Sequence, residues 1–518
     1  MARAKGGRIW RSGAAQGLRQ GPRRCYPNLV RVGGWVLGLC VAAALGGIRE
    51  AGAQSMSLTA KTIYHAYQIN LWPGQDLGYR DLNRFYTTLD VGGWSLGPGG
   101  DIDAVMSLRY DTDFGTGFHI DTPAQVGIPA TDQRNDLDLI FAYVDWKNIV
   151  KGRLHGRLGR QVLVDDLAWY SLDGVNLTFI PWRSGRDNVT LSAYVGMPVR
   201  FDVVFSSEPF LNDGTQVKDN TAGLAFGGTA RASLFGGLDL SVSYRQEVAF
   251  RKGELEAFRN DLDGAAASAG SIGLQESRLG ASAGYTIQPL HADVYGSLIW
   301  DAITGAIEQA RAGVGYDPIR GVHVQGEYLR SRPRFAGDSI FNWFNIFAYD
   351  RGRLELSLEL IPGLTVQGGY LLQVFGGGTT ATSGADFPGS DLSHGPSGGV
   401  SYRSPRFGAG VHGEAATNGG GSYAYGGNYR SGWAWADVSF LERTLVADAR
   451  VSLTTVQTDW YAGNDAGQVA PADTTVNVAL GGRANLFDFL SARVMFVKNF
   501  GAALEGSYRI YSELAVRY

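Results

Sequence analysis

Hydrophobic and polar residues alternate one by one along most of this chain. In the segment 353–360 leucine fills every second position, and the residues between the leucines are Arg353, Glu355, Ser357 and Glu359. Side chains of a strand point alternately to two faces, whereas a helix would distribute these leucines around its axis. The segment therefore predicts a strand with one apolar face and one polar face.

The same two-residue period recurs along the chain. In 238–247 the polar positions include Asp239, Arg245 and Glu247, and the segment 322–328 repeats the division. Clusters of Gly, Pro, Asn and Asp separate such segments, and no convincing stretch of helical periodicity intervenes. The pattern predicts an all-β protein made of antiparallel strands.

The last segment, 507–518, alternates in the same way and ends on an aromatic residue. One face carries Tyr508, Ile510, Leu514, Val516 and Tyr518, and the other carries Arg509, Tyr511, Glu513, Ala515 and Arg517. This ending resembles the C-terminal assembly signal of Gram-negative outer-membrane barrels, with Leu514, Val516 and Tyr518 at the matching positions. The resemblance implies a barrel that the barrel-assembly machinery inserts through its last strand, with Tyr518 at the periplasmic end.

The lengths of the connections support a barrel independently. Outer-membrane barrels alternate short periplasmic turns with long external loops. Counted back from Tyr518, the expected short connections are 485–488, 441–443, 404–406, 361–363, 317–321, 288–289 and 236–237. The expected long connections between them include 461–473, 376–396, 330–342, 251–271, 206–219 and 112–134. A soluble β protein of several domains has no reason to keep this alternation.

These observations predict a single large antiparallel transmembrane β-barrel over residues 54–518. The alternating segments number about 22, within a range of about 18–24. An even number of strands brings both ends of the chain to the periplasm. The strands within 59–69 and 168–198 are the hardest to assign. In the second region two tryptophans and two prolines interrupt the alternating pattern. Mean hydropathy is −0.09, and no apolar run beyond the N-terminal region approaches the length of a membrane helix.

The N-terminal region has the features of a secretory signal. Residues 1–31 contain several Lys and Arg and no acidic residue, the apolar stretch 32–48 follows, and Ala51 and Ala53 form an A-x-A cleavage site. We expect residues 1–53, a signal peptide with a basic N-terminal extension, to be removed. A single membrane anchor is the alternative. Both cysteines, Cys25 and Cys40, lie in this region, so the mature chain would have no thiol.

The start of the mature chain bears on the class of barrel. A TonB-dependent transporter has a similar number of strands but needs a plug domain before them, for which Gln54 to Lys61 leaves no room. The porin class therefore fits best. The segment Arg157–Gln161, followed by Asp173 and Gly174, resembles a strand and loop of porins of the alginate-export kind, without specifying a solute.

Charged residues on the polar faces are the candidates for lining the lumen. They are Arg153, His155, Arg157, Asp239, Arg245, Glu247, Arg353, Glu355, Glu359, Arg509, Glu513 and Arg517. The basic members could form a ladder for anionic solutes. Because acidic members share the same faces, pairing between neighbouring strands that stabilises the wall is the favoured interpretation.

The chemistry of an enzyme is not expected. His394 and Ser397 superficially suggest a phospholipase of the outer membrane, but their spacing departs from that motif and they fall in a Gly/Ser/Thr-rich stretch expected to be a loop. The other histidines show no metal-binding spacing. We expect no catalytic residue, no cofactor and no metal, and the net charge of −3 does not favour a nucleic acid.

The sequence thus predicts a porin in the outer membrane of a Gram-negative bacterium, through which small hydrophilic solutes diffuse passively. Its expected partners are outer-membrane lipid, the barrel-assembly machinery and the solutes, and a homo-oligomer is left open. One alternative is the sheath of a porin–cytochrome electron conduit, in which a periplasmic cytochrome would carry the haem. A structural or adhesive barrel with a blocked lumen is another alternative.

Overall fold

A computed structural model describes most of the chain beyond the N-terminal region. The described residues are 55–70, 79–96, 99–113, 135–199, 223–249, 273–303, 305–332, 348–375, 391–418, 428–441, 444–457, 473–501 and 508–517. The expected signal peptide, its cleavage site at Ala51 and Ala53, and the terminal Tyr518 lie outside these residues.

The described residues form 22 strands and one 3-10 turn, Gln288–Leu290, labelled η2. The strands are β1 Ser55–Asn70, β2 Tyr79–Leu96, β3 Ile102–Asp113, β4 Asn135–Val150, β5 Leu154–Asp165, β6 Ala168–Ser184, β7 Asp187–Pro198, β8 Gly223–Leu234, β9 Leu238–Ala249, β10 Gly273–Ile287, β11 Ala292–Asp301, β12 Ala306–Ile319, β13 Val322–Ser331, β14 Tyr349–Ile361, β15 Leu364–Phe375, β16 Asp391–Arg403, β17 Phe407–Asn418, β18 Asn428–Phe440, β19 Leu445–Gln457, β20 Asp473–Phe487, β21 Leu490–Phe500 and β22 Tyr508–Arg517. In the part of the chain that is described, no helix has the length and apolar character to cross a membrane.

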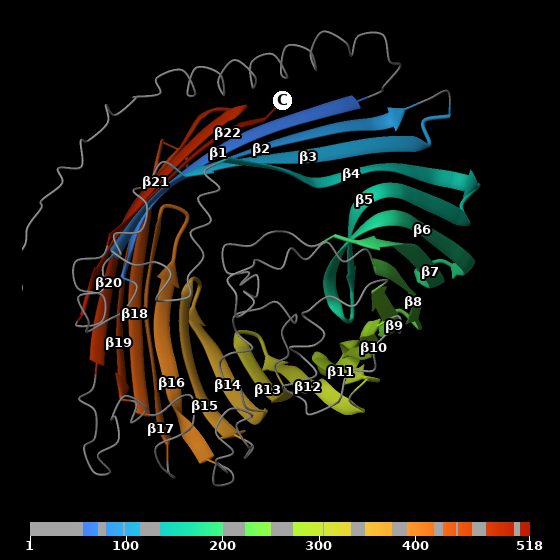
Figure 1. Cartoon of the computed structure of the whole chain (residues 1–518). Helices are drawn as coiled ribbons and strands as arrows, with labels where there is room; N and C mark the ends of the chain where they lie inside the picture. Colours follow the sequence, from blue (N-terminus) through green and yellow to red (C-terminus); the bar gives the residue numbers. More distant parts are fainter. Residues whose placement is uncertain are drawn as a thin grey trace, which may run out of the picture. The chain divides into compact units, whose positions relative to one another are not determined.

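The sheet closes on itself. Each strand pairs antiparallel with the next along the chain, and β22 pairs with β1 from Thr59 opposite Arg517 to Tyr67 opposite Arg509. Figure 1 shows β1 and β22 side by side. The fold is therefore a closed, 22-stranded antiparallel barrel, as the sequence predicts.

The two faces of the strands differ as the alternation predicts. On β14, Leu354 is 59% exposed and Leu360 is 60% exposed, whereas Arg353 and Glu355 on the other face form an ion pair of 2.5 Å. On β22, Leu514 is 48% exposed and the following residue, Ala515, is only 3% exposed. Rows of large exposed apolar side chains suit a surface that contacts hydrocarbon.

Connection lengths alternate along the barrel with two exceptions. Connections after even-numbered strands have two to five residues, and those after odd-numbered strands have seven to 24 residues, except after β5 and β11. These two have only two and four residues. One expected loop also differs: His394 and Ser397 lie within β16, because this strand begins at Asp391 and pairs with β15 throughout its length.

Candidate functional site

The β5–β6 hairpin leaves the wall of the barrel partway along its length. β5 pairs with β4 from Leu154 to Arg160, the partner of Ala142, but continues to Asp165 without pairing further with β4. Its pairing with β6 persists as far as Asp165 opposite Ala168. Pairing of β6 with β7 begins only at Leu172 opposite Pro198, beyond which one backbone bond joins Val199 to Ser171. The far end of the hairpin is therefore paired with neither neighbouring strand of the wall, and it can bend away from both.

Glycines mark the position of the bend. Gly159 of β5 lies opposite Gly174 of β6, and Gly159 has a φ of +122°, a conformation that other residues rarely adopt. A Cβ atom at Gly159 would lie 2.3 Å from the carbonyl oxygen of Ala142, and one at Gly174 would lie 2.2 Å from that of Val195. The strands thus approach one another here more closely than any side chain permits.

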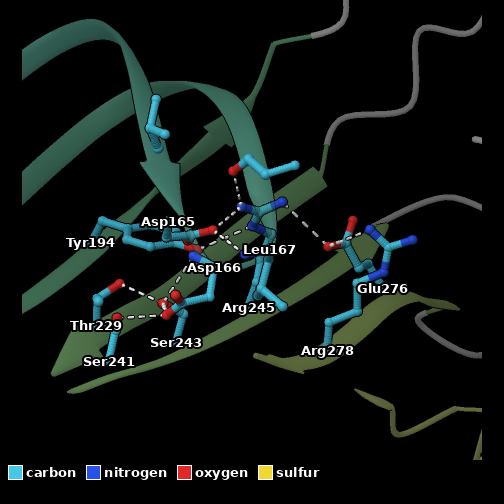
Figure 2. Close-up of polar contacts among 12 residues, drawn as sticks. Asp165, Asp166, Leu167, Tyr194, Thr229, Ser241, Ser243, Arg245, Glu276 and Arg278 are labelled. Carbon is cyan, nitrogen blue, oxygen red and sulfur yellow. Dashed lines mark hydrogen bonds and ion pairs between the residues drawn. The ribbon is translucent and has the colours of Figure 1, made fainter. Parts of the chain in front are cut away.

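The tip of the hairpin docks on strands far from its neighbours in the sheet. Asp166 lies in the two-residue turn, and its Oδ2 accepts hydrogen bonds from Ser241 (2.6 Å) and Ser243 (2.8 Å) of β9. Its Oδ1 accepts one from Ser282 of β10 at 2.7 Å. Figure 2 shows Asp166 beside the two serines of β9. The turn is therefore anchored to two strands through a single carboxylate.

The environment of Asp166 stabilises its charged form. Burial raises the pKa of this carboxyl group, but hydrogen bonds from Ser241, Ser282 and Ser243 and the charge of Arg231 lower it, and the pKa lies below its usual range. The group is consequently ionised at neutral pH, when all three hydroxyl groups can donate to it.

Arg245 of β9 provides the second anchor. Its guanidinium contacts Asp165 at 3.0 Å and the carbonyl oxygen of Ala168 at 3.3 Å, one on each strand of the hairpin. Nε donates to the hydroxyl of Tyr194 at 3.3 Å, and the ring of Tyr170 lies 4.3 Å from the guanidinium carbon. The side chains of Arg245 and Asp165 are 3% and 4% exposed, so this ion pair is almost fully buried.

Apolar contacts complete the docking. Leu172 of β6 is fully buried and clusters with Leu163 of β5, Tyr194 of β7 and Ala225 of β8. Leu167, in the turn, is 2% exposed. A Cβ atom at Gly280 of β10 would lie 2.8 Å from Leu167, so the glycine provides the space that the tip occupies. The hairpin is fastened by packing as well as by charge.

These contacts place the hairpin against the inner face of the barrel. β6 and β10 are four strands apart, roughly 19 Å along the wall. Strands that are not neighbours can meet only on the concave side of a closed sheet. The face of β9 that carries Arg245 is therefore the inner face, and the hairpin crosses part of the lumen.

Two predicted charged residues, Arg245 and Glu247, belong to this site. Glu247 is 6% exposed and accepts a hydrogen bond from the hydroxyl of Tyr170 at 3.0 Å. Asp239 lies on the same face of β9 but away from the hairpin, where Ser233 donates to it at 2.6 Å. The predicted residues of β9 thus divide between the docking site and the adjoining wall.

Three of the predicted lumen residues, Arg153, His155 and Arg157, follow one another closely in the chain but do not all lie on one strand. Arg153 belongs to the turn before β5, and its backbone N–H donates to the carbonyl oxygen of Val150 at 2.9 Å, which closes the turn. His155 is the second residue of β5, and Arg157 pairs with Asp145 of β4 at 2.8 Å. These three residues therefore include one turn residue and one ion-paired strand residue.

The other predicted residues lie on β14 and β22. Glu359 accepts the backbone N–H of Gly363 at 3.2 Å, and Glu513 pairs with Lys61 of β1 at 3.1 Å. Arg509 and Arg517 share a face of β22 with Glu513. The pairs at Glu513 and Arg157 join neighbouring strands and so stabilise the wall, whereas the Arg353–Glu355 pair lies within β14. Contact of these residues with a solute stays a prediction.

Apart from Arg245 and Glu247, the residues that hold the hairpin were not predicted from the sequence. Asp165, Asp166 and Leu167 were not singled out, nor were the serines of β9 and β10. The available signal was a two-residue connection at the end of the barrel where long loops are expected. Among the described residues, no cluster of acidic residues, histidine and cysteine has the makings of a metal site.

Comparisons with known proteins concern the fold. No family model and no curated protein matches the sequence. A point mutant of the ferric enterobactin receptor PfeA from Pseudomonas aeruginosa matches with a TM-score of 0.54 and 10% identity, over 91% of this chain and 81% of its own. The siderophore receptor PirA from Acinetobacter baumannii matches with a TM-score of 0.51 and 10% identity, over 89% and 80%. These likenesses support a barrel of this kind and no shared activity.

Another solved structure is similar over a comparable length. The outer membrane protein OpdK from Pseudomonas aeruginosa matches with a TM-score of 0.39 and 10% identity, over 89% of this chain and 98% of its own. A score this low adds nothing to the assignment of the fold.

Proposed function

We propose that the chain is a porin-type channel of the Gram-negative outer membrane, through which small hydrophilic solutes diffuse passively. The observation that carries this proposal is the docked β5–β6 hairpin inside a closed barrel. The hairpin narrows the lumen, and the outer surface carries the exposed apolar side chains that lipid requires.

The size of the barrel explains why an internal element is needed. Twenty-two strands spaced about 4.8 Å apart and tilted by about 40° form a wall roughly 140 Å in perimeter. Barrels of 16–18 strands already leave an aqueous channel, and those of 22 strands are usually plugged. A hairpin fixed across part of the lumen reduces the free cross-section to a size that can select small solutes.

The hairpin also bears on the two alternative functions. A sheath around a folded cytochrome needs an unobstructed lumen, and the Asp166 and Arg245 contacts hold the hairpin within it. A structural barrel needs no passage at all. The channel is favoured over both because one small element narrows the lumen and polar groups line the neighbouring wall.

Swelling of liposomes that contain the protein tests this function. In an isotonic medium of a small sugar such as arabinose, liposomes with the folded mature protein are expected to swell faster than protein-free liposomes. A large oligosaccharide is expected to enter more slowly. Absence of swelling with arabinose, from protein shown to be folded and inserted, would reject the channel.

A further inference from the structure

The bend of the hairpin opens a seam in the wall of the barrel. Pairing between β4 and β5 ends at Ala142 opposite Arg160, but β4 extends seven residues further, to Asn135. On its other side, this part of β4 remains paired with β3. Among the described residues, no strand pairs with the edge that β5 leaves.

The seam lies at membrane depth. Trp146 of β4 is 52% exposed and sits near the end with short turns, and Leu137, nine residues along the strand, is 69% exposed. Nine residues of a tilted strand rise by roughly 23 Å, close to the height of about 25 Å of the apolar band of a barrel. The seam therefore runs from about the middle of the membrane to its outer side.

An ion pair lies at the base of the seam. Nε and one terminal nitrogen of Arg160 each donate to a carboxylate oxygen of Asp173 at 2.7 Å. The other terminal nitrogen donates to the carbonyl oxygen of Leu139 at 2.9 Å, a backbone group that faces the gap. Arg160 alternates with Leu158, which is 62% exposed, so the pair lies on the outer face of the hairpin.

Water must reach such groups. Charged side chains on a lipid-facing surface are costly, and an open sheet edge is tolerated at membrane depth only where it is buried in protein or lines a water-filled space. Among the described residues no strand covers this edge, and the charged Arg160–Asp173 pair beside it favours water. The Arg160–Asp173 pair and the unpaired edge of β4 meet both conditions at the same place. The seam is therefore wet, although lipid surrounds it.

Apolar side chains border this wet seam. Leu137 stands on the β4 side, and Leu158 of β5, opposite Val144 at the base of the seam, is 62% exposed. Leu158 shares the face of β5 that carries Arg160. Polar and apolar surfaces thus meet along one opening, a combination that suits a molecule with a hydrocarbon chain and a polar head.

We propose that the seam between β4 and β5 admits single-chain amphiphiles between the membrane and the lumen. The hydrocarbon chain lies against Leu137 and Leu158, and the polar head stays in the water of the seam. The inference rests on the membrane location in the proposed function, and adds to it a lateral route and a class of substrate.

Thiol labelling tests the seam directly. The only cysteines, Cys25 and Cys40, lie in the segment expected to be removed, so an introduced thiol would be unique. L139C places a thiol at the seam. L298C is the matched control, because Leu298 pairs with strands on both sides. The two thiols would lie at similar depths in the membrane. Leu298 is two residues from Trp300, near the end of β11, and Leu139 is two residues from Leu137, which pairs with Tyr110 near the end of β3.

Both variants are treated in liposomes with a membrane-impermeant maleimide, with and without laurate or glucose. We expect the seam thiol to react at least about tenfold faster than the control, because the impermeant reagent is excluded from lipid but enters water. Laurate is expected to slow this reaction, and glucose is not. Equal reactivity of the two thiols, equal slowing of both by laurate, or disulfide-linked dimers of L139C would overturn the inference.

The two proposals fail separately. Liposomes that take up arabinose while neither thiol reacts would overturn the seam and leave the channel in place. A reactive, laurate-protected seam in liposomes that take up no sugar would overturn the channel alone.

Discussion

Replacing Arg245 by methionine tests whether the hairpin is held inside the barrel by charge. Methionine keeps much of the length of the side chain but removes its hydrogen bonds and its charge. The variant loses the contacts with Asp165, the carbonyl oxygen of Ala168 and the hydroxyl of Tyr194. The carboxylate of Asp165, 4% exposed, is left without its buried cation.

The size of the effect follows from this burial. Removing one partner of a buried ion pair costs about 3–5 kcal/mol, because the remaining charge is desolvated and unpaired. The hairpin can avoid this cost by leaving the wall, which returns Asp165 to water. The loss of stability is therefore limited to the free energy of docking, and we expect an undocked hairpin in an intact barrel.

Single-channel recording would detect the undocked state. Arg245→Met is expected to give larger and more variable conductance steps than the original protein, while the barrel still shows a heat-dependent shift on gels. Asp239→Asn is the matched control, since Asp239 lies on the same face of β9 and contacts Ser233 rather than the hairpin. Asp165→Asn, combined with Arg245→Met, is expected to restore part of the docking. Conductance identical to the original protein in Arg245→Met would refute the role of this pair.

Three further predictions follow from the same structure. Gly280→Val should displace Leu167 and enlarge the conductance, because even a Cβ atom would lie 2.8 Å from that side chain. Docking should weaken in recordings only as the pH falls through the pKa of Asp166, which lies below that of an ordinary aspartate, because a carboxyl group with a lowered folded-state pKa stabilises docking above that pKa. An unchanged titration in Asp166→Asn would contradict this. Leu514→Lys should lower the unfolding free energy by about 2–4 kcal/mol if Leu514 lies mid-membrane, because it would place a charge on the lipid-facing side of β22. Glu513→Gln, on the lumen-facing side, should lower it by much less. Equal losses of the two variants in denaturant titrations would contradict this assignment of the two faces.

Much of the barrel could be predicted from the sequence because its signals are local. Alternation defines each strand and so gives their approximate number, and the phase of short and long connections counted from the C-terminus gives their parity. An even number of antiparallel strands allows the first and last to pair antiparallel, as β1 and β22 do. Short-range pattern is sufficient wherever one face meets lipid and the other meets water.

The hairpin could not be predicted in this way because its contacts are distant in sequence. Asp166 and Ser282 are 116 residues apart, and no pattern within either segment indicates the other. The strands within residues 168–198 were hard to assign from the sequence for a physical reason. Leu163 and Leu172 are apolar on the inner face, because this face packs on protein rather than facing water. Local alternation therefore weakens where the hairpin docks.

The most direct test of the account is the conductance of the mature protein in a planar lipid bilayer. We expect discrete, stable steps from the original protein and larger steps from Arg245→Met. Protein that is demonstrably folded and inserted but never conducts, in either form, would contradict the central claim that this barrel is a channel narrowed by its own hairpin.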